Sequence, residues 1–181
     1  DLTASRAHAR GVGRAGVLND QEVNQLCDAL DALHEDWRSG AFTLDDRYED
    51  GHSAIEAYLT ARLGEVGKKI HTGRSRNDQV LVATRLYMRE ALSEALRHVK
   101  EAASVALERA EQDPNTPMPG YTHLQRAVPS STGMWFAGWA EALIDDATLL
   151  AFTARWVDAN PLGTAAGYGV NVALERDGVS A

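Results

Sequence analysis

Apolar residues recur along most of this chain at spacings of three and four, which is the repeat of an amphipathic α-helix. The clearest case lies between Asn19 and Gly40, where Asn19 and Glu22 resemble a capping box and Gly40 is a suitable helix end. The apolar stripe of this helix consists of Val23, Leu26, Leu30, Leu33 and Trp37. No stretch of four to eight residues alternates cleanly between apolar and polar, as a half-buried strand would. The pattern therefore predicts an all-α chain.

Two stretches predict helices well beyond the average length of three or four turns. The first runs from about Asp78 to Gln112 and the second from about Ser130 to Ala159. A proline-rich break separates them. Two helices of roughly 30 residues cannot bury their apolar faces on each other alone, so we expect a long-helix bundle that completes itself by oligomerising.

Shorter helices precede the two long ones. We expect one helix over residues 1–15 and another that ends just before Gly64, followed by an aperiodic polar segment over residues 65–77. These elements predict a small, incomplete N-terminal helical domain over residues 1–76. Residues 77–181 then form the first part of a central long-helix bundle, with an Ala- and Gly-rich tail that shows no clear pattern.

The bulk composition disfavours several classes of protein. The 181 residues carry a formal net charge of -8, which disfavours nucleic-acid binding because that binding depends on clustered Lys and Arg. No apolar run approaches the ~18 residues needed to span a bilayer, and no signal peptide is visible. The single cysteine, Cys27, can form no intrachain disulfide and suits a cytoplasmic protein. The chain starts at Asp1 and stops without a clear ending, which indicates a fragment.

A dense polar cluster occupies residues 72–79, Thr-Gly-Arg-Ser-Arg-Asn-Asp-Gln, at the start of the first long helix. The free N–H groups of a helix N-terminus favour anions, and arginine adds planar donors that match a carboxylate. The cluster therefore indicates a binding site for a molecule with several carboxylates. The alternative is a solvated loop in which Asn77 or Asp78 only caps the helix.

A second polar cluster, residues 119–125, lies between the two long helices. It contains His123, and histidine is the side chain best suited to proton transfer near neutral pH. Thr122 and Gln125 could hold a substrate oxygen or orient the imidazole ring. The alternative is a histidine that only packs or caps at a helix break.

A third and weaker cluster, residues 49–53, precedes the short third helix. It places His52 beside Asp50. The alternative is that Asp50 or Ser53 simply caps the helix.

The sequence indicates neither a metal site nor a cofactor site. His8 and His71 have no cysteine or histidine at ligand spacing, which argues against zinc. The Gly67-Lys68 pair lacks the preceding strand and the spaced glycine of a phosphate-binding loop. We therefore expect chemistry that needs no metal and no cofactor.

Two of the polar clusters resemble signature blocks of the argininosuccinate lyases. Residues 71–80, His-Thr-Gly-Arg-Ser-Arg-Asn-Asp-Gln-Val, are similar to the first block, and residues 118–125, Met-Pro-Gly-Tyr-Thr-His-Leu-Gln, to the second. Residues 4–10, 49–52 and 161–163 match as well, so the resemblance covers nearly the whole chain. It implies a fumarase/aspartase-like all-α fold and a homotetramer whose active sites draw on several subunits. It also implies cleavage of argininosuccinate to fumarate and arginine by β-elimination of a C–N bond, without a cofactor.

The same resemblance implies roles for individual residues. Three residues of the first block would bind the substrate carboxylates: Ser75, Arg76 and Asn77. Thr122 and Gln125 would hold the substrate around the scissile bond, and His123 would be a general acid or base that assists the leaving nitrogen. Three further residues would be secondary members of the site: Ser5, Asp50 and His52.

Some positions depart from the family pattern. Tyr48 stands where many relatives have an acidic residue, and Gly11 and Gly13 stand where relatives favour larger helix formers. The family's third block, a Ser-rich loop that leads into Met-Pro-Gln-Lys, is absent, and with it the serine credited with taking the Cβ proton. We therefore expect this stretch alone to be inactive.

Other functions fit the same resemblance. A non-catalytic structural protein on this fold, like the δ-crystallins of the lens, would keep the helices without the chemistry. Another lyase of the superfamily would act on adenylosuccinate or malate instead. The stretch alone could also be a helical oligomerisation module.

Overall fold

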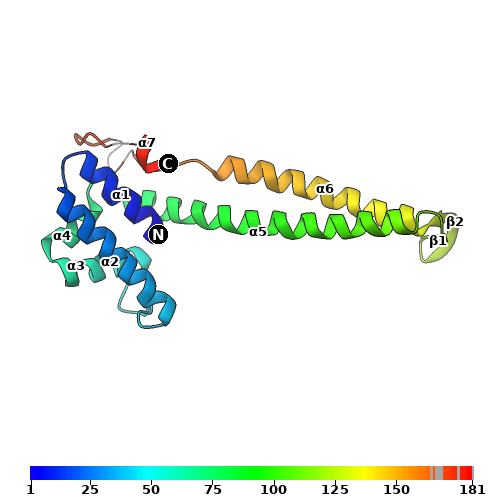
Figure 1. Ribbon diagram of the computed structural model, residues 1–181, viewed down its shortest axis with the longest axis horizontal. Coiled ribbons are helices and arrows are strands. Elements are labelled where there is room, and N and C mark those ends of the chain that lie inside the picture. Colours follow the sequence, from blue (N-terminus) through cyan, green and yellow to red (C-terminus); the bar gives the residue numbers. More distant parts are fainter. Residues whose placement is uncertain (164, 166–168, 175, 181) are drawn as a thin grey trace. The chain divides into compact units, whose positions relative to one another are not determined.

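The computed structural model describes residues 1–163, 165, 169–174 and 176–180. Its elements in chain order are α1 (Leu2–Arg14), α2 (Asp20–Ser39), α3 (Gly51–Leu63), α4 (Glu65–Lys68), the 3₁₀ turn η1 (Lys69–His71), α5 (Arg76–Gln112), β1 (Pro117–Thr122), β2 (Gln125–Ser131), α6 (Thr132–Val157) and α7 (Asp177–Ser180) (Figure 1). The described part of the chain is mainly helical, which confirms the predicted fold class. The Ala- and Gly-rich tail lies partly outside the described residues.

Two compact units make up the chain. The first comprises Asp1–Leu86 and Ala159–Ala181, and the second comprises Tyr87–Asp158. Helix α5 begins in the first unit and continues into the second. The domain boundary expected at residue 76 coincides with the start of α5 and stays a prediction.

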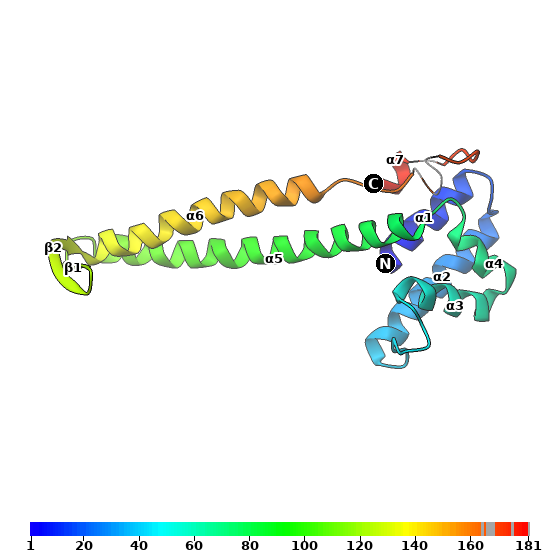
Figure 2. The ribbon, with the colours of Figure 1, turned by 180° about the vertical axis from the view of Figure 1, so that it is seen from behind.

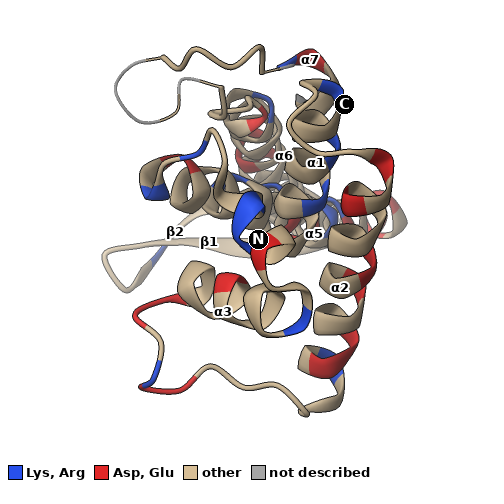
Figure 3. Ribbon diagram, turned by 90° about the vertical axis from the view of Figure 1, so that its left-hand side faces the viewer, with Lys and Arg blue, Asp and Glu red and all other residues tan. Residues whose placement is uncertain are grey.

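The core of the first unit lies between α1, α2 and α3 and includes η1. Its largest fully buried side chains are Val12, Leu26, Leu30, Leu33, Leu59 and Ile70. The predicted apolar stripe of α2 therefore faces the core along its middle. Figure 3 shows acidic residues along the outer side of α2, although Asp36 faces α3 and accepts a hydrogen bond from the Tyr58 hydroxyl. Trp37 is an exception at 52% exposed, because it lies near the end of α2 at the rim of an open groove.

The helix ends of the first unit follow the predicted capping signals. The side chain of Asn19 accepts a hydrogen bond from the Glu22 N–H, and the Glu22 carboxylate accepts one from the Asn19 N–H. Gly40 ends α2 in the left-handed conformation at φ 78°, which glycine adopts without the steric cost of a Cβ atom.

Gly67 makes the closest backbone approach in the first unit. A Cβ atom at this position would lie 2.4 Å from the Leu59 carbonyl oxygen, and backbone cannot move aside as a flexible side chain can. We therefore expect Gly67→Ala to lower the free energy of unfolding of the whole protein by about 2 kcal/mol or more, measured by chemical denaturation. Gly51→Ala is the control, since the nearest atom to its added Cβ atom lies 3.5 Å away, at the Asp1 carboxylate, an ordinary van der Waals contact, and it should be near neutral. Equal stabilities for the two variants would contradict the close packing of α4 on α3.

A β-hairpin, which the sequence analysis did not predict, joins α5 to α6. Strands β1 and β2 pair in antiparallel register from Pro117 opposite Ser131 to Thr122 opposite Gln125. Most of their side chains are exposed, so neither strand has the buried face that would produce an alternating pattern. The expectation of a chain without strands was wrong here, although the hairpin is a minor part of the fold.

The second unit consists of most of α5, the hairpin and α6. The two helices run side by side in opposite directions (Figures 1 and 2). Many large apolar side chains of α6 are nevertheless exposed: Met134, Trp135, Trp139, Ile144, Leu149, Phe152 and Trp156. Among the described helices, none is both long and apolar enough to cross a membrane.

Candidate active site

Arg76, the first residue of α5, contacts the loop before α3. Its Nη1 donates hydrogen bonds to the Asp50 carboxylate and, at 3.0 Å, to the Ser53 hydroxyl. Asp50 is also the N-cap of α3, where it accepts a hydrogen bond from the Ser53 N–H at 2.8 Å. The structure therefore joins the third polar cluster to the first, a contact that the sequence analysis did not predict.

The remaining nitrogens of Arg76 are available to a ligand. Within the described residues, its Nε and Nη2 have no hydrogen-bond partner, since every bond formed by Arg76 uses Nη1. The side chain is 41% exposed. Asp50 thus anchors one edge of the guanidinium and leaves the other edge free for a two-pronged contact with a carboxylate.

Hydrogen bonding determines the charge state of Asp50. Burial alone would raise the pKa of this carboxyl, but bonds from the Ser53 N–H, the Arg76 guanidinium and the Ser53 hydroxyl outweigh burial and lower the pKa from 3.8 to about 2. Asp50 is therefore a carboxylate throughout the physiological range, and it compensates part of the charge of Arg76.

This shift predicts how stability depends on pH. Because the pKa of Asp50 in the fold lies below the ordinary 3.8, its stabilisation is complete above that value and is lost as the pH falls toward 2. We expect the difference in free energy of unfolding between wild type and Asp50→Asn to shrink as the pH falls from 4 to 2, in urea titrations of the whole protein. Asp46→Asn, which alters an exposed aspartate of the same loop, is the control. A difference that stays constant over this range would contradict the assigned interaction.

Ser75 and Asp78 cap the start of α5 through reciprocal hydrogen bonds. The Ser75 N–H donates to the Asp78 carboxylate at 3.1 Å, and the Asp78 N–H donates to the Ser75 hydroxyl at 3.4 Å. The cap is thus Ser75, not Asn77 or Asp78 as the alternative interpretation held. Asn77 is exposed, and buried Gln79 has a side-chain oxygen without a donor among the described residues.

Two buried histidines of the first unit are held neutral. The Nε2 of His8 lies 2.8 Å from the Thr72 carbonyl, to which it donates, and burial together with nearby Arg74 lowers its pKa to about 4. The Nδ1 of His52 lies 3.2 Å from the Asp1 carboxylate, and burial lowers its pKa as well. Both histidines connect elements of the first unit, and neither partner was predictable from the sequence.

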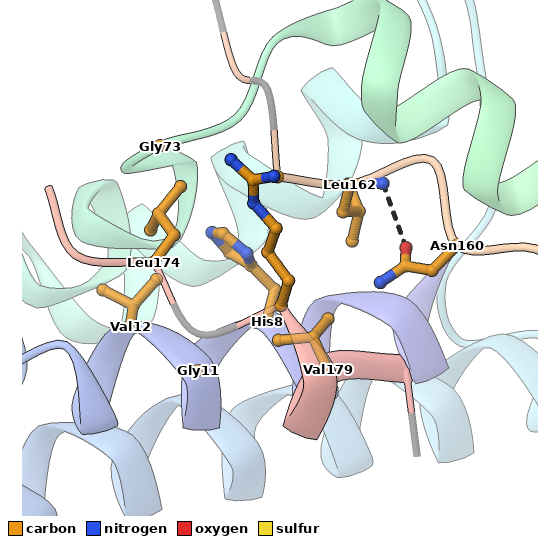
Figure 4. Close-up of a pocket in the computed structure, with 10 residues that line it drawn as sticks. His8, Gly11, Val12, Gly73, Asn160, Leu162, Leu174 and Val179 are labelled. Atoms are coloured by element: carbon orange, nitrogen blue, oxygen red, sulfur yellow. Dashed lines mark hydrogen bonds between the residues drawn. The ribbon is translucent and has the colours of Figure 1, made fainter. Parts of the chain in front are cut away.

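One pocket beside α1 is too small for a substrate. It lies in the first unit, where His8 and Val12 of α1 face Leu162 and Leu174 (Figure 4). Its volume of about 20 Å³ suits a single water molecule. Asn160 shapes one side by accepting a hydrogen bond from the Leu162 N–H at 3.0 Å. This pocket is therefore no candidate for the substrate site, and the exposed polar clusters remain the candidates.

Gly13, one of the two glycines that depart from the family pattern, lies at a close contact between α1 and α2. A Cβ atom on Gly13 would lie 2.5 Å from a methyl carbon of Val23. Glycine therefore lets α1 approach α2 closely at this point.

The hairpin tip of the second unit gathers the other predicted site residues. The Thr122 hydroxyl lies 2.8 Å from the Nδ1 of His123, within hydrogen-bond distance, and Gln125 pairs with Thr122 across the strands. The turn residues His123 and Leu124 have φ of 51° and 62°, a conformation that costs energy for residues with a Cβ atom. The side chains of the tip are exposed, so the imidazole can reach a molecule outside its own hairpin.

Similarity to known proteins covers nearly the whole chain. A family model described as "Lyase" matches residues 1–179. The argininosuccinate lyase of Xanthomonas oryzae pv. oryzae (strain PXO99A) is 59% identical over 176 residues, which are 97% of this chain and 41% of that protein. The argininosuccinate lyase of Stenotrophomonas maltophilia (strain R551-3) is 58% identical over 181 residues, which are all of this chain and 42% of that protein. The chain thus spans about two fifths of the length of these relatives.

Solved structures share the fold. EDDS lyase in complex with formate matches with a TM-score of 0.86 at 26% identity, over 99% of this chain and 35% of that one. The structure described as fumarate lyase:delta crystallin from Brucella melitensis matches with a TM-score of 0.73 at 17% identity, over 88% of this chain and 40% of that one. The predicted fumarase/aspartase-like helical fold is confirmed.

Proposed function

Since the chain belongs to the lyase family whose model matches residues 1–179, we propose that it is part of an argininosuccinate lyase. The whole protein would cleave argininosuccinate to fumarate and arginine by β-elimination of a C–N bond. The observation that carries the proposal is Arg76, which stands in the first turn of a 37-residue helix with one edge held by Asp50 and the other edge free. A guanidinium and a helix N-terminus together favour a carboxylate ligand.

The predicted residues take complementary parts in this reaction. Loss of the Cβ proton next to a carboxylate produces an enolate-like dianion, and fixed donors aimed at that charge lower the barrier. Three residues at the start of α5 supply such donors: Ser75, Arg76 and Asn77. Thr122 and Gln125 would hold the substrate near the scissile bond while His123 protonates the departing guanidino nitrogen.

Three residues would support the site from α1 and α3. Asp50 orients Arg76 through the pair described above. His52 stays neutral and links α3 to Asp1. Ser5 receives a hydrogen bond from the turn that precedes α5. None of these roles needs a metal or a cofactor.

The site would draw on more than one copy of the protein. Helix α5 has 37 residues, which at 1.5 Å per residue is about 55 Å. Arg76 begins this helix, and the hairpin with His123 follows its end, so a site that uses both takes them from different copies. The exposed apolar side chains of α6 support a homo-oligomer, since a monomer rarely exposes so many, and we propose a tetramer. The buried cysteine suits a cytoplasmic enzyme.

A direct assay of the whole protein tests the proposal. Purified protein is mixed with argininosuccinate, and fumarate is followed by its ultraviolet absorbance while arginine is measured separately. Equal amounts of the two products support the proposal. Adenylosuccinate and malate, assayed in parallel, identify another lyase of the same family. A folded, oligomeric protein without activity on any of the three would instead indicate a structural protein like the δ-crystallins.

A further inference from the structure

Arg74 is a buried cation whose charge no carboxylate neutralises at close range. Its side chain is 6% exposed. In the part of the chain that the structure describes, no carboxylate lies within ion-pair distance of it, and Glu56 acts only through its longer-range field. Burial lowers its pKa to about 10, so the guanidinium remains charged at neutral pH. Its Nε also lacks a hydrogen-bond partner among these residues.

A buried charge without a close partner costs free energy, so a chain that needed only packing here would gain by using an apolar side chain. The surroundings offset only part of this cost, through the field of Glu56 and two hydrogen bonds. Two buried histidines feel the charge of Arg74, His8 and His52, and in both it adds to burial in lowering the pKa. The described residues therefore compensate the charge of Arg74 only in part.

The hydrogen bonds of Arg74 tie α1 to the turn before α5. Its Nη1 donates to the Ser5 hydroxyl at 3.2 Å, and its Nη2 donates to the Ile70 carbonyl at 2.9 Å. A guanidinium can only donate, so the Ser5 oxygen must accept and its own proton points elsewhere. Among the described residues, no group accepts that proton. Arg74, which directly precedes Ser75 in the sequence, thus leaves the Ser5 hydroxyl free to donate a hydrogen bond.

We infer that Arg74 is a positioning residue for the dicarboxylate part of the substrate. It orients the Ser5 hydroxyl as a donor, and it adds positive charge next to the residues at the start of α5 that would bind the substrate carboxylates. The inference rests on the proposed function. Arg74 acts through Ser5 and through its field, whereas Arg76 would contact the substrate.

The test compares four variants of the whole protein with wild type by steady-state kinetics on argininosuccinate. Arg74→Met removes the charge and both hydrogen bonds, and we expect KM to rise roughly 10- to 100-fold with a smaller change in kcat. Arg74→Lys keeps the charge and loses the two-pronged contact, so it should recover part of the loss. Ser5→Ala and the double variant that combines Ser5→Ala with Arg74→Met complete a double-mutant cycle. Because Arg74 acts partly through Ser5, the double variant should fall well short of the sum of the two single effects.

Arg6→Met is the matched control. Arg6 neighbours Ser5 in sequence, but its guanidinium pairs with Asp31 on α2, so its removal should leave KM unchanged. Circular dichroism and elution volume report folding separately from kinetics. If Arg74→Met is folded and leaves KM unchanged, or if its effect simply adds to that of Ser5→Ala, the inference is wrong while the proposed function stands. If Arg74→Met does not fold, Arg74→Lys decides, because a folded Lys variant with wild-type KM overturns the inference. A wild-type protein without activity would overturn the proposed function itself.

Discussion

His123→Asn in the whole protein lowers kcat for argininosuccinate by about 100-fold or more, the loss typical of a general acid or base. Asparagine keeps a polar side chain of similar reach but cannot carry a proton to the leaving nitrogen. The side chain is exposed at the hairpin tip, so the substitution should leave folding and assembly unchanged. Initial rates of fumarate release at saturating substrate measure the effect.

His98→Asn is the control for this prediction, because His98 is an exposed histidine of α5 in the same unit. It should retain the wild-type kcat. Near-normal fumarate release by His123→Asn would show that the imidazole does not transfer the proton, even though the fold is that of a lyase.

Arg76→Met lowers kcat/KM for argininosuccinate by about 100-fold or more, since a charged, two-pronged contact with a ligand is among the stronger hydrogen-bonding interactions. The variant loses the free edge that would bind the substrate carboxylate, and it also leaves Asp50 without its cation. We expect KM to rise, because the carboxylate is already charged before the reaction, and kcat to fall, because the charge on it grows as the Cβ proton leaves.

Arg47→Met is matched to this variant. Arg47 forms a two-pronged pair with Asp45 on an exposed loop, so its loss also leaves an aspartate without its cation, but Arg47 has no proposed contact with the substrate. It should change kcat/KM by less than about 3-fold, as expected for an exposed ion pair. Equal effects of the two substitutions would mean that Arg76 serves only to stabilise α3.

The longer helices were predictable because they carry periodic or capping signals, whereas α4 and η1 lie in the segment 65–77 that was expected to be aperiodic. Asn19, Glu22 and Gly40 set the ends of α2 as the sequence indicates, and the predicted long helices differ from α5 and α6 by only two residues at each end or fewer. These signals act over three or four residues, so a single sequence contains them in full.

The hairpin was not predictable from apolar periodicity. Its strands contain Pro117, Pro119 and Pro129, which suggest a break, and they have no buried face. Backbone pairing holds the strands together. The turn at His123 and Leu124 has positive φ angles without the glycine or asparagine that usually marks such a turn. Predictions from local sequence are expected to fail at a strained turn that carries candidate catalytic residues.

The site was predictable as a set of residues but not as a set of contacts. The signature blocks identify the start of α5 and the hairpin tip, whereas the pair between Asp50 and Arg76 joins residues 26 positions apart. The same holds for Arg74 and Ser5, which are 69 positions apart. Such contacts depend on how α1 and α3 pack against the turn before α5, and nothing in the spacing of one sequence reports that packing.

Mixed oligomers test the shared site most directly. His123→Asn and Arg76→Met subunits of the whole protein are co-expressed with different tags, and oligomers that carry both tags are purified and assayed. If each site takes Arg76 from one copy and His123 from another, random assembly leaves about a quarter of the sites intact, and the mixture should regain roughly that share of wild-type activity. Mixed oligomers no more active than either parent would contradict a site built from two copies.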